Sequence, residues 1–221
     1  MEPREMYRVA EECGKYLMEA YAYLHSPYIK SLKETLAGKA IGEVDYIETA
    51  FITQGYAEDI RLHKEMGGGA MYDLGCYCTT MILSLTDSDP VFVRACAEFS
   101  DLGVDSMTSG LIRFDNGVRA SFNVGMILGE DTDARFDRLC IHGTKGYIRS
   151  DTEYNQEGDV SYEVYTADGV KKINVTVPNN YCLEVEQLGR CIAGDEDPYV
   201  TAAFSVKNAE LIDSILEEIG Y

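Results

Sequence analysis

Short runs that alternate apolar and polar side chains fill residues 90 to 177, and this pattern constrains the fold more than any other feature. Asn116-Gly117 lies between two such runs and predicts a two-residue hairpin turn. Thr144-Lys145-Gly146 and Asp168-Gly169 predict two more hairpins. Because hairpins pair neighbouring strands in opposite directions, the segment predicts an antiparallel sheet.

Helical patterns lie on both sides of this strand-rich segment. Ser26 is a suitable N-cap and Pro27 fits a first helical position, and Gly194 is placed to end another helix. The expected helices cover residues 4–16, 26–42, about 72–85, 181–194 and 201–220. Residues 16–24, rich in tyrosine, and residues 43–53 predict two further strands, and residues 54–66 predict a loop.

Grouped strands with helices towards the two ends of the chain predict an α+β fold. We expect an open, mostly antiparallel sheet of about six or more strands, with helices packed on one face. Residues 91–99 carry apolar side chains on both faces, so the free face is available for dimerisation. The alternative is a sheet covered by its own loops.

The chain of 221 residues carries 38 acidic and 19 basic side chains, a formal net charge of −19. Such a surface repels phosphate groups, so neither nucleic acid nor an anionic membrane is expected as a partner. The sequence shows no signal peptide and no apolar run of membrane length. Its seven cysteines lack zinc-site spacing, which favours a reducing, cytoplasmic setting.

Several well-known site motifs are missing from the sequence. No GxGxxG follows an expected strand, and neither a GxxxxGK[ST] phosphate loop nor an HExxH motif occurs. The three histidines, His25, His63 and His142, are far apart in the chain. We therefore expect neither a metal site nor a cofactor-binding residue within these 221 residues.

The most unusual local stretch is "GGGAMYDLGCY", residues 67–77. Its glycines allow close approach of another backbone or of a ligand, and Asp73 and Tyr77 share a face if the segment is helical. A phenol can donate or accept a proton near neutral pH when a cation lowers its pKa. Arg61 and Lys64 are the nearest cations in the sequence. The alternative is an ordinary turn followed by a packing contact.

Several stretches resemble the C-terminal domain of the glucose–fructose oxidoreductase/inositol dehydrogenase family, called the Gfo/Idh/MocA family. They are "MEAYAYLHSPYIKSLKETLAGKAIGEVDYIETAF", "DIRLHKEMGGGAMYDLGCYCTTMILSL", "FDNGVRASFNVGM", "IHGTKGYI" and "LEVEQLGRCIAG". The resemblance implies an NAD(P)-dependent oxidoreductase acting on a sugar, a polyol or a cyclic alcohol. It also implies a homodimer formed through the open sheet, and a cofactor held by an N-terminal Rossmann domain.

The resemblance assigns roles to single residues. Tyr77 matches the branch similar to dihydrodiol dehydrogenases, in which it transfers the proton, and Asp73 matches the family aspartate four residues earlier. Residues expected at the substrate are Arg61, His25, Tyr23 and Gly69. Each has a simpler reading: a surface ion pair for Arg61, a backbone hydrogen bond for His25, a core position for Tyr23 and a turn for Gly69.

The chain departs from the family pattern in two places. It begins after the expected Rossmann domain and its Glu-Lys-Pro lysine, so residues 1–15 look like the helix that follows that motif. Residues 16–221 then form the substrate-binding and dimerisation domain, with NAD or NADP bound only in a full-length protein. Ser26 also stands where many members have histidine, which weakens the case for His25. A stand-alone binding module on the same fold is the alternative function.

Overall fold

The computed structural model describes residues 3–129 and 134–221 and shows an α+β fold with one eight-stranded sheet. Along the sheet the strands are ordered β2-β3-β4-β1-β5-β6-β7-β8. Their bounds are β1 Val44–Gln54, β2 Pro90–Phe99, β3 Asp105–Phe114, β4 Arg119–Leu128, β5 Arg135–Gly143, β6 Gly146–Ser150, β7 Gly158–Thr166 and β8 Gly169–Val177.

All neighbouring strands pair antiparallel except β1 and β4, which run parallel. The three predicted hairpins are confirmed, and Gly117 and Gly169 adopt the positive φ angles of 88° and 119° that their turns require. Strand β1 comes first in the chain and sits in the middle of the sheet, with Thr49 opposite Phe122 on one side and Leu139 on the other.

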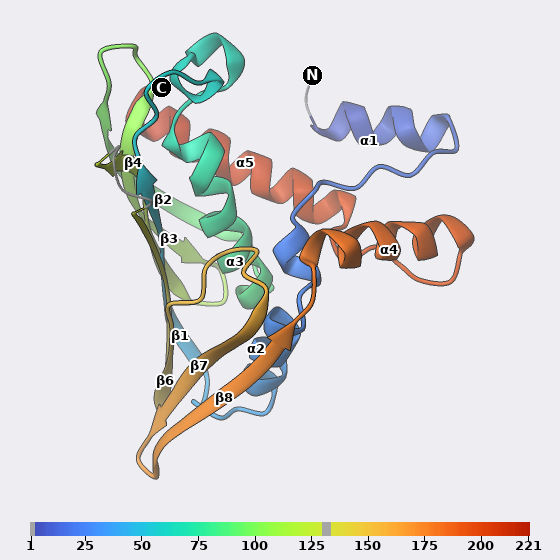
Figure 1. Cartoon of the computed structure of the whole chain (residues 1–221), viewed down its shortest axis with the longest axis vertical. Coiled ribbons are helices and arrows are strands. Elements are labelled where there is room, and N and C mark those ends of the chain that lie inside the picture. The colour runs from blue at the N-terminus through green and yellow to red at the C-terminus, as the bar shows by residue number, and fades with distance from the viewer. Residues whose placement is uncertain (1–2, 130–133) are drawn as a thin grey trace.

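Five α-helices lie on one side of the sheet and leave the other side uncovered (Figure 1). Their bounds are α1 Pro3–Glu12, α2 Pro27–Ala37, α3 Cys76–Thr86, α4 Asn180–Ala193 and α5 Ala202–Ile219. Ser26, Asn179 and Thr201 cap three of them, each accepting a hydrogen bond from a backbone N–H in the first turn. Helices α3 and α5 pack over the strands. The hydrophobic core lies between these helices and the sheet, and it includes the inward-facing strand residues Ile47, Phe122 and Ile141.

The uncovered face of the sheet carries large apolar side chains at regular intervals. They come from six strands and are all exposed: Phe92, Leu111, Ile127, Phe136, Tyr147 and Val170. On the same face, the rings of Tyr147 and Tyr165 stack with centroids 4.4 Å apart. This face therefore exposes apolar side chains from six strands, and its use in dimerisation stays a prediction.

The strand predicted for residues 16–24 is wrong. Residues 16–21 are irregular, and Ala22–His25 form a 3-10 turn that leads into the Ser26 cap of α2. The tyrosine hydroxyls explain the difference, because they bond to helices rather than line a sheet face: Tyr21 accepts from Asn208 of α5 at 3.1 Å, and Tyr23 reaches Thr80 of α3 at 2.8 Å.

The helix predicted at about 72–85 is present but begins differently. Met71–Gly75 form a single π-helical turn, and the regular helix α3 starts only at Cys76. The preceding loop contains two short 3-10 turns, Ile60–Leu62 and Lys64–Met66. Among the helices described, none is long and apolar enough to cross a bilayer.

Candidate functional site

The three glycines before the π turn bring the loop close to two other segments. Gly67 ends a 3-10 turn with φ 74°, and the Gly69 N–H donates to the Arg61 carbonyl at 2.8 Å. Gly69 has φ 104°, and a Cβ placed there would lie 2.1 Å from Oδ1 of Asp105. A carboxylate of this chain occupies that space, whereas the sequence predicted the approach of another backbone or of a ligand, and a contact of Gly69 with substrate stays a prediction.

Asp105, the first residue of β3, fixes the start of the π turn through its carboxylate. It is fully buried, and its Oδ2 accepts hydrogen bonds from the Met71 N–H at 2.9 Å and from the Thr108 hydroxyl at 2.6 Å. Burial raises the pKa of Asp105 above its ordinary value, against the lowering effect of these donors. Nothing in the sequence pattern distinguished Asp105 from the other acidic turn residues.

Asp73 lies on the π turn and pairs with Arg61 rather than with Tyr77. The Arg61 Nε is 2.7 Å from Asp73 Oδ1, and Arg61 Nη1 is 3.0 Å from Asp59 Oδ1. The Tyr56 hydroxyl donates to Asp73 Oδ2 at 3.4 Å, and the Arg61 guanidinium lies 5.0 Å from the Tyr56 ring centroid. Arg61 therefore already serves two carboxylates, and a role in holding substrate stays a prediction.

Tyr77 lies near the start of α3 and is half-buried among aromatic rings. Burial raises the pKa of its phenol, and the nearby Cys76, Tyr181 and Asp73 act in the same direction. A contact with the side chain of Asn155 acts to lower it. The rings within 5.3 to 6.1 Å of it, centroid to centroid, belong to Tyr21, Tyr23, Phe51 and Tyr154.

Tyr23 is buried beside Tyr77, and its hydroxyl is fully engaged. It donates to the backbone carbonyl of Tyr77 at 3.2 Å and lies 2.8 Å from the Thr80 hydroxyl. Burial raises its pKa well above the ordinary value. Tyr23 thus holds helix α3 in place, and its proposed contact with substrate would be through the ring alone.

His25 lies in the 3-10 turn before α2 and faces a different neighbourhood. It is 8% exposed, its ring stacks on Tyr199 at 5.6 Å, and neither ring nitrogen has a hydrogen-bond partner among the described residues. Burial lowers its pKa, so the imidazole is neutral near pH 7. The contacts described for His25 do not include Tyr77, and its expected role at the substrate stays a prediction.

Three residues that no sequence pattern indicated, Tyr154, Asn155 and Arg135, complete the surroundings of Tyr77. Asn155 lies in the loop between β6 and β7 with a positive φ of 60°, and its Nδ2 donates to the Tyr181 hydroxyl at 3.4 Å. Arg135 of β5 places its guanidinium 4.4 Å from the Phe51 ring centroid, which makes it a cation close to the aromatic group. The sequence pattern of residues 134–150 predicted a strand but could not place Arg135 near Tyr77, which is 58 residues earlier in the chain (135 − 77 = 58).

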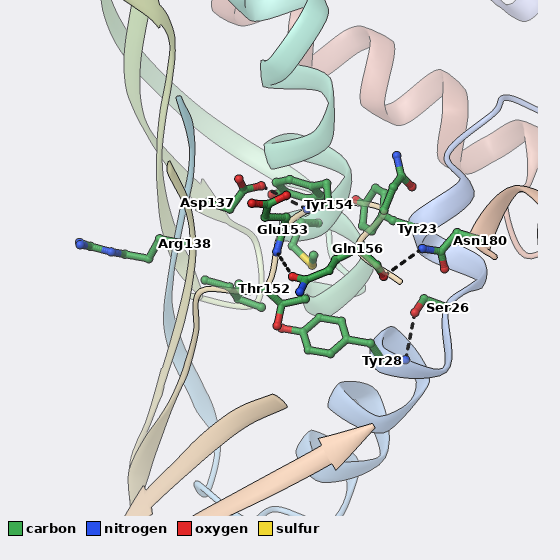
Figure 2. Close-up of a pocket in the computed structure, with 13 residues that line it drawn as sticks. Tyr23, Ser26, Tyr28, Asp137, Arg138, Thr152, Glu153, Tyr154, Gln156 and Asn180 are labelled. Atoms are coloured by element: carbon green, nitrogen blue, oxygen red, sulfur yellow. Dashed lines mark hydrogen bonds between the residues drawn. The ribbon is translucent and has the colours of Figure 1, made fainter. Parts of the chain in front are cut away.

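A small cavity lies under this loop, lined by residues that include Tyr23, Asp137, Tyr154 and Asn180 (Figure 2). Its volume of about 20 Å³ has room for a water molecule but not for a sugar. Among the described residues, no three histidine, cysteine or acidic side chains are grouped so that they could hold a metal ion.

Residues 29–149 match the family model described as the GFO/IDH/MocA C-terminal domain. The chain is 28% identical over 228 aligned positions to a trans-1,2-dihydrobenzene-1,2-diol dehydrogenase from Xenopus laevis, with 98% of this chain and 67% of the relative covered. It is also 28% identical to a D-xylose 1-dehydrogenase (NADP(+)) from Haloferax volcanii, with 98% and 66% covered.

Among solved structures, the fold matches KijD10, a 3-ketoreductase from Actinomadura kijaniata in complex with NADP and TDP-benzene. The TM-score is 0.90 at 21% identity, over 98% of this chain and 66% of that one. The chain thus spans about two thirds of the length of the proteins it resembles.

Proposed function

Because the chain belongs to the GFO/IDH/MocA C-terminal domain family, we propose that it is the substrate-binding domain of an NAD(P)-dependent oxidoreductase. The substrate would be a sugar, a polyol or a cyclic alcohol, as the names of the dihydrodiol and xylose dehydrogenases suggest. The observation that carries the proposal is the half-buried phenol of Tyr77, held by aromatic rings next to the Asp73–Arg61 ion pair.

The groups around Tyr77 suit proton transfer and hydroxyl binding. A phenol can move a proton, and carboxylate and guanidinium groups can bind hydroxyls, but none of them can accept a hydride. The donor set therefore fits a nicotinamide brought to the open surface beside Tyr77, which takes or supplies the hydride. We place that cofactor on a separate Rossmann domain, a proposal supported by the greater length of the relatives.

Tyr77 would exchange a proton with the substrate oxygen. Its raised pKa keeps the phenol protonated near neutral pH, so in the direction of reduction it is ready to donate to a carbonyl oxygen. In the direction of oxidation the phenol must first lose its proton, which a nearby cation would favour. Asp73 and Arg61 would orient a substrate hydroxyl, and the rings of Tyr23 and Tyr154 would bury one side of it.

Two measurements test this proposal. Calorimetric titration of NADP and NADPH into the 221-residue chain is expected to show no binding, and micromolar binding would contradict the placement of the cofactor. A longer protein that includes any in-frame upstream coding sequence is expected to reduce NADP⁺ with trans-1,2-dihydrobenzene-1,2-diol or D-xylose. If that longer protein has no nicotinamide-dependent activity on any sugar, polyol or diol tested, a binding module without redox chemistry becomes the better account.

A further inference from the structure

The strongest structural feature near Tyr77 that the proposed function does not use is an ion pair on β5. The Arg135 Nε lies 2.6 Å from Asp137 Oδ2, and Arg135 Nη2 lies 2.9 Å from Asp137 Oδ1. Two parallel bonds of this kind fix the guanidinium plane as well as its position. The Asp137 side chain is 1% exposed, and the Phe51 ring lies 4.4 Å from the guanidinium, so the pair is held rigidly.

This ion pair also forms hydrogen bonds with the loop between β6 and β7, all of them at Tyr154. Asp137 Oδ1 accepts from the Tyr154 N–H at 3.2 Å, and Arg135 Nη2 donates to the Tyr154 carbonyl at 3.2 Å. Both backbone polar groups of Tyr154 are therefore bonded to the same ion pair. An ion pair that contributed only charge would not need to form hydrogen bonds with both the N–H and the carbonyl of Tyr154.

The part of the loop that lines the small cavity is held by a separate set of hydrogen bonds (Figure 2). Gln156 Oε1 accepts from the Glu153 N–H at 3.0 Å, and the Asn180 amide donates to the Gln156 carbonyl at 3.4 Å. Residues 153–156 are thus bonded on both sides of Asn155. The loop has no regular secondary structure, and these hydrogen bonds fix its path.

Together, these hydrogen bonds fix the position of Asn155. Its φ of 60° lies in the left-handed region, which asparagine adopts more readily than most non-glycine residues, and the bonds on both sides of it hold this conformation. Its Oδ1 is buried without a hydrogen-bond partner among the described residues, and its amide acts to lower the pKa of the Tyr77 phenol. The ring of the preceding residue, Tyr154, lies 5.3 Å from the Tyr77 ring, centroid to centroid, which places this loop beside the phenol. An unsatisfied buried oxygen next to the reacting group is the kind of cost that a functional position explains.

We propose that the Arg135–Asp137 pair is a positioning device that fixes the Tyr154 peptide groups and thereby holds the Asn155 amide against the Tyr77 hydroxyl. This inference rests on the proposed function, since it gives the pair a role in presenting Tyr77 to substrate. Arg135 and Asp137 do not touch the reacting atoms. They act through the loop, and Asn155 orients the phenol.

Two substitutions of Arg135 can distinguish this positioning role from a purely electrostatic role. Arg135→Lys keeps the positive charge but cannot make two parallel bonds to Asp137 and a third to Tyr154. Arg135→Gln removes the charge as well. If position matters, both variants lose function; if only charge matters, lysine restores it.

The test uses the longer protein with its cofactor domain, with NADP⁺ and the best diol or sugar substrate found for it. The Tyr77 titration is followed by NMR of ¹³Cζ-labelled tyrosine, with the signal assigned through Tyr77→Phe. Arg135→Lys and Arg135→Gln are each expected to lower kcat at least about tenfold, with KM little changed, and to move the Tyr77 titration to higher pH. Asn155→Gly, which suits the backbone angle, is expected to reproduce both effects even if the Arg135 variants fold poorly.

Arg149→Gln is the matched control, because Arg149 of the neighbouring strand β6 makes an exposed pair with Asp151, two residues further along the chain. It is expected to behave as wild type. Wild-type kcat and titration in Arg135→Lys, or an unmoved Tyr77 titration in Asn155→Gly, would overturn the inference. If Tyr77→Phe stays active while the Tyr77 titration still shifts in the Arg135 and Asn155 variants, the proposed function fails and the positioning role stands. If Tyr77→Phe is inactive but the Tyr77 titration does not shift in those variants, only the positioning role fails.

Discussion

At the scale of single residues, the surroundings of Tyr77 make its phenol a weak acid that keeps its proton. Four aromatic rings exclude water from much of its surface, and the carboxylate of Asp73 adds to the effect. Two cations were suggested for it by sequence order. Arg61 is bonded to Asp73 and Asp59 instead, and Lys64 lies over the Tyr221 ring. Arg135, from a distant strand, lies 4.4 Å from the ring centroid of Phe51, and the Phe51 ring packs against Tyr77.

Glu184, on the inward side of α4, gives a prediction at this scale. It is 9% exposed, its Oε1 has no partner among the described residues, and burial raises its pKa. Because the folded pKa is raised, the ionised form costs stability only as pH rises above the ordinary glutamate value of about 4.3. Glu184→Gln should therefore raise the free energy of unfolding at about pH 7 but not at about pH 4.

Urea unfolding at the two pH values measures this difference. The exposed Glu186→Gln on the same helix is the control, and it should change stability equally little at both. An equal gain from Glu184→Gln at both pH values would show that the buried charge is not the cause.

At the scale of elements, the glycine turn depends on backbone geometry that only glycine provides. Gly69→Ala would place a Cβ 2.1 Å from the bonded carboxylate of Asp105 at a φ of 104°. We expect a loss of about 2 kcal/mol or more in the free energy of unfolding, measured by urea denaturation.

Gly189→Ala provides the comparison, because Gly189 lies inside α4 with open space around its Cα. Alanine should stabilise the helix there by up to about 1 kcal/mol. Equal and small effects at both positions would mean that the turn around Gly69 can relax, contrary to the packing described.

The sheet and most helices could be predicted from the sequence because their signals are local. Asn116-Gly117 and Asp168-Gly169 fix their turns within a few residues, and Ser26-Pro27 fixes a helix start in the same way. Residues 16–24 were predicted wrongly because tyrosine favours strands on average. The hydroxyls of Tyr21 and Tyr23 are bonded to α5 and α3, and such tertiary contacts override the local preference.

The candidate site could be predicted only in part, for the same reason. Asp73 and Tyr77 belong to one short segment, so their neighbourhood was visible in the sequence, although the π turn at Met71–Gly75 was not. Arg135, Tyr154 and Asn155 reach Tyr77 only because β5 and the loop after β6 pass near the start of α3. No spacing rule connects residues so far apart.

At the scale of the whole molecule, the uncovered sheet face leads to a prediction of a homodimer (Figure 1). Light scattering should give twice the 24.6 kDa mass of one chain. Leu111→Glu would place a charge among the exposed apolar side chains of that face and should shift the protein towards monomer. Ile192→Glu, at an exposed apolar position on α4, should leave the dimer intact, and a wild-type protein of single-chain mass would contradict the prediction.

We propose that this domain contributes Tyr77 as the proton-transfer residue of a nicotinamide-dependent oxidoreductase. The most direct test is the turnover of Tyr77→Phe in the longer protein that carries the cofactor domain, with Tyr72→Phe as the control. Tyr72 is exposed on the preceding turn and packs against Tyr221. We expect kcat to fall by about 10²–10⁴-fold for Tyr77→Phe, with the fold intact, and to stay near wild type for Tyr72→Phe. Wild-type turnover by Tyr77→Phe would contradict the account.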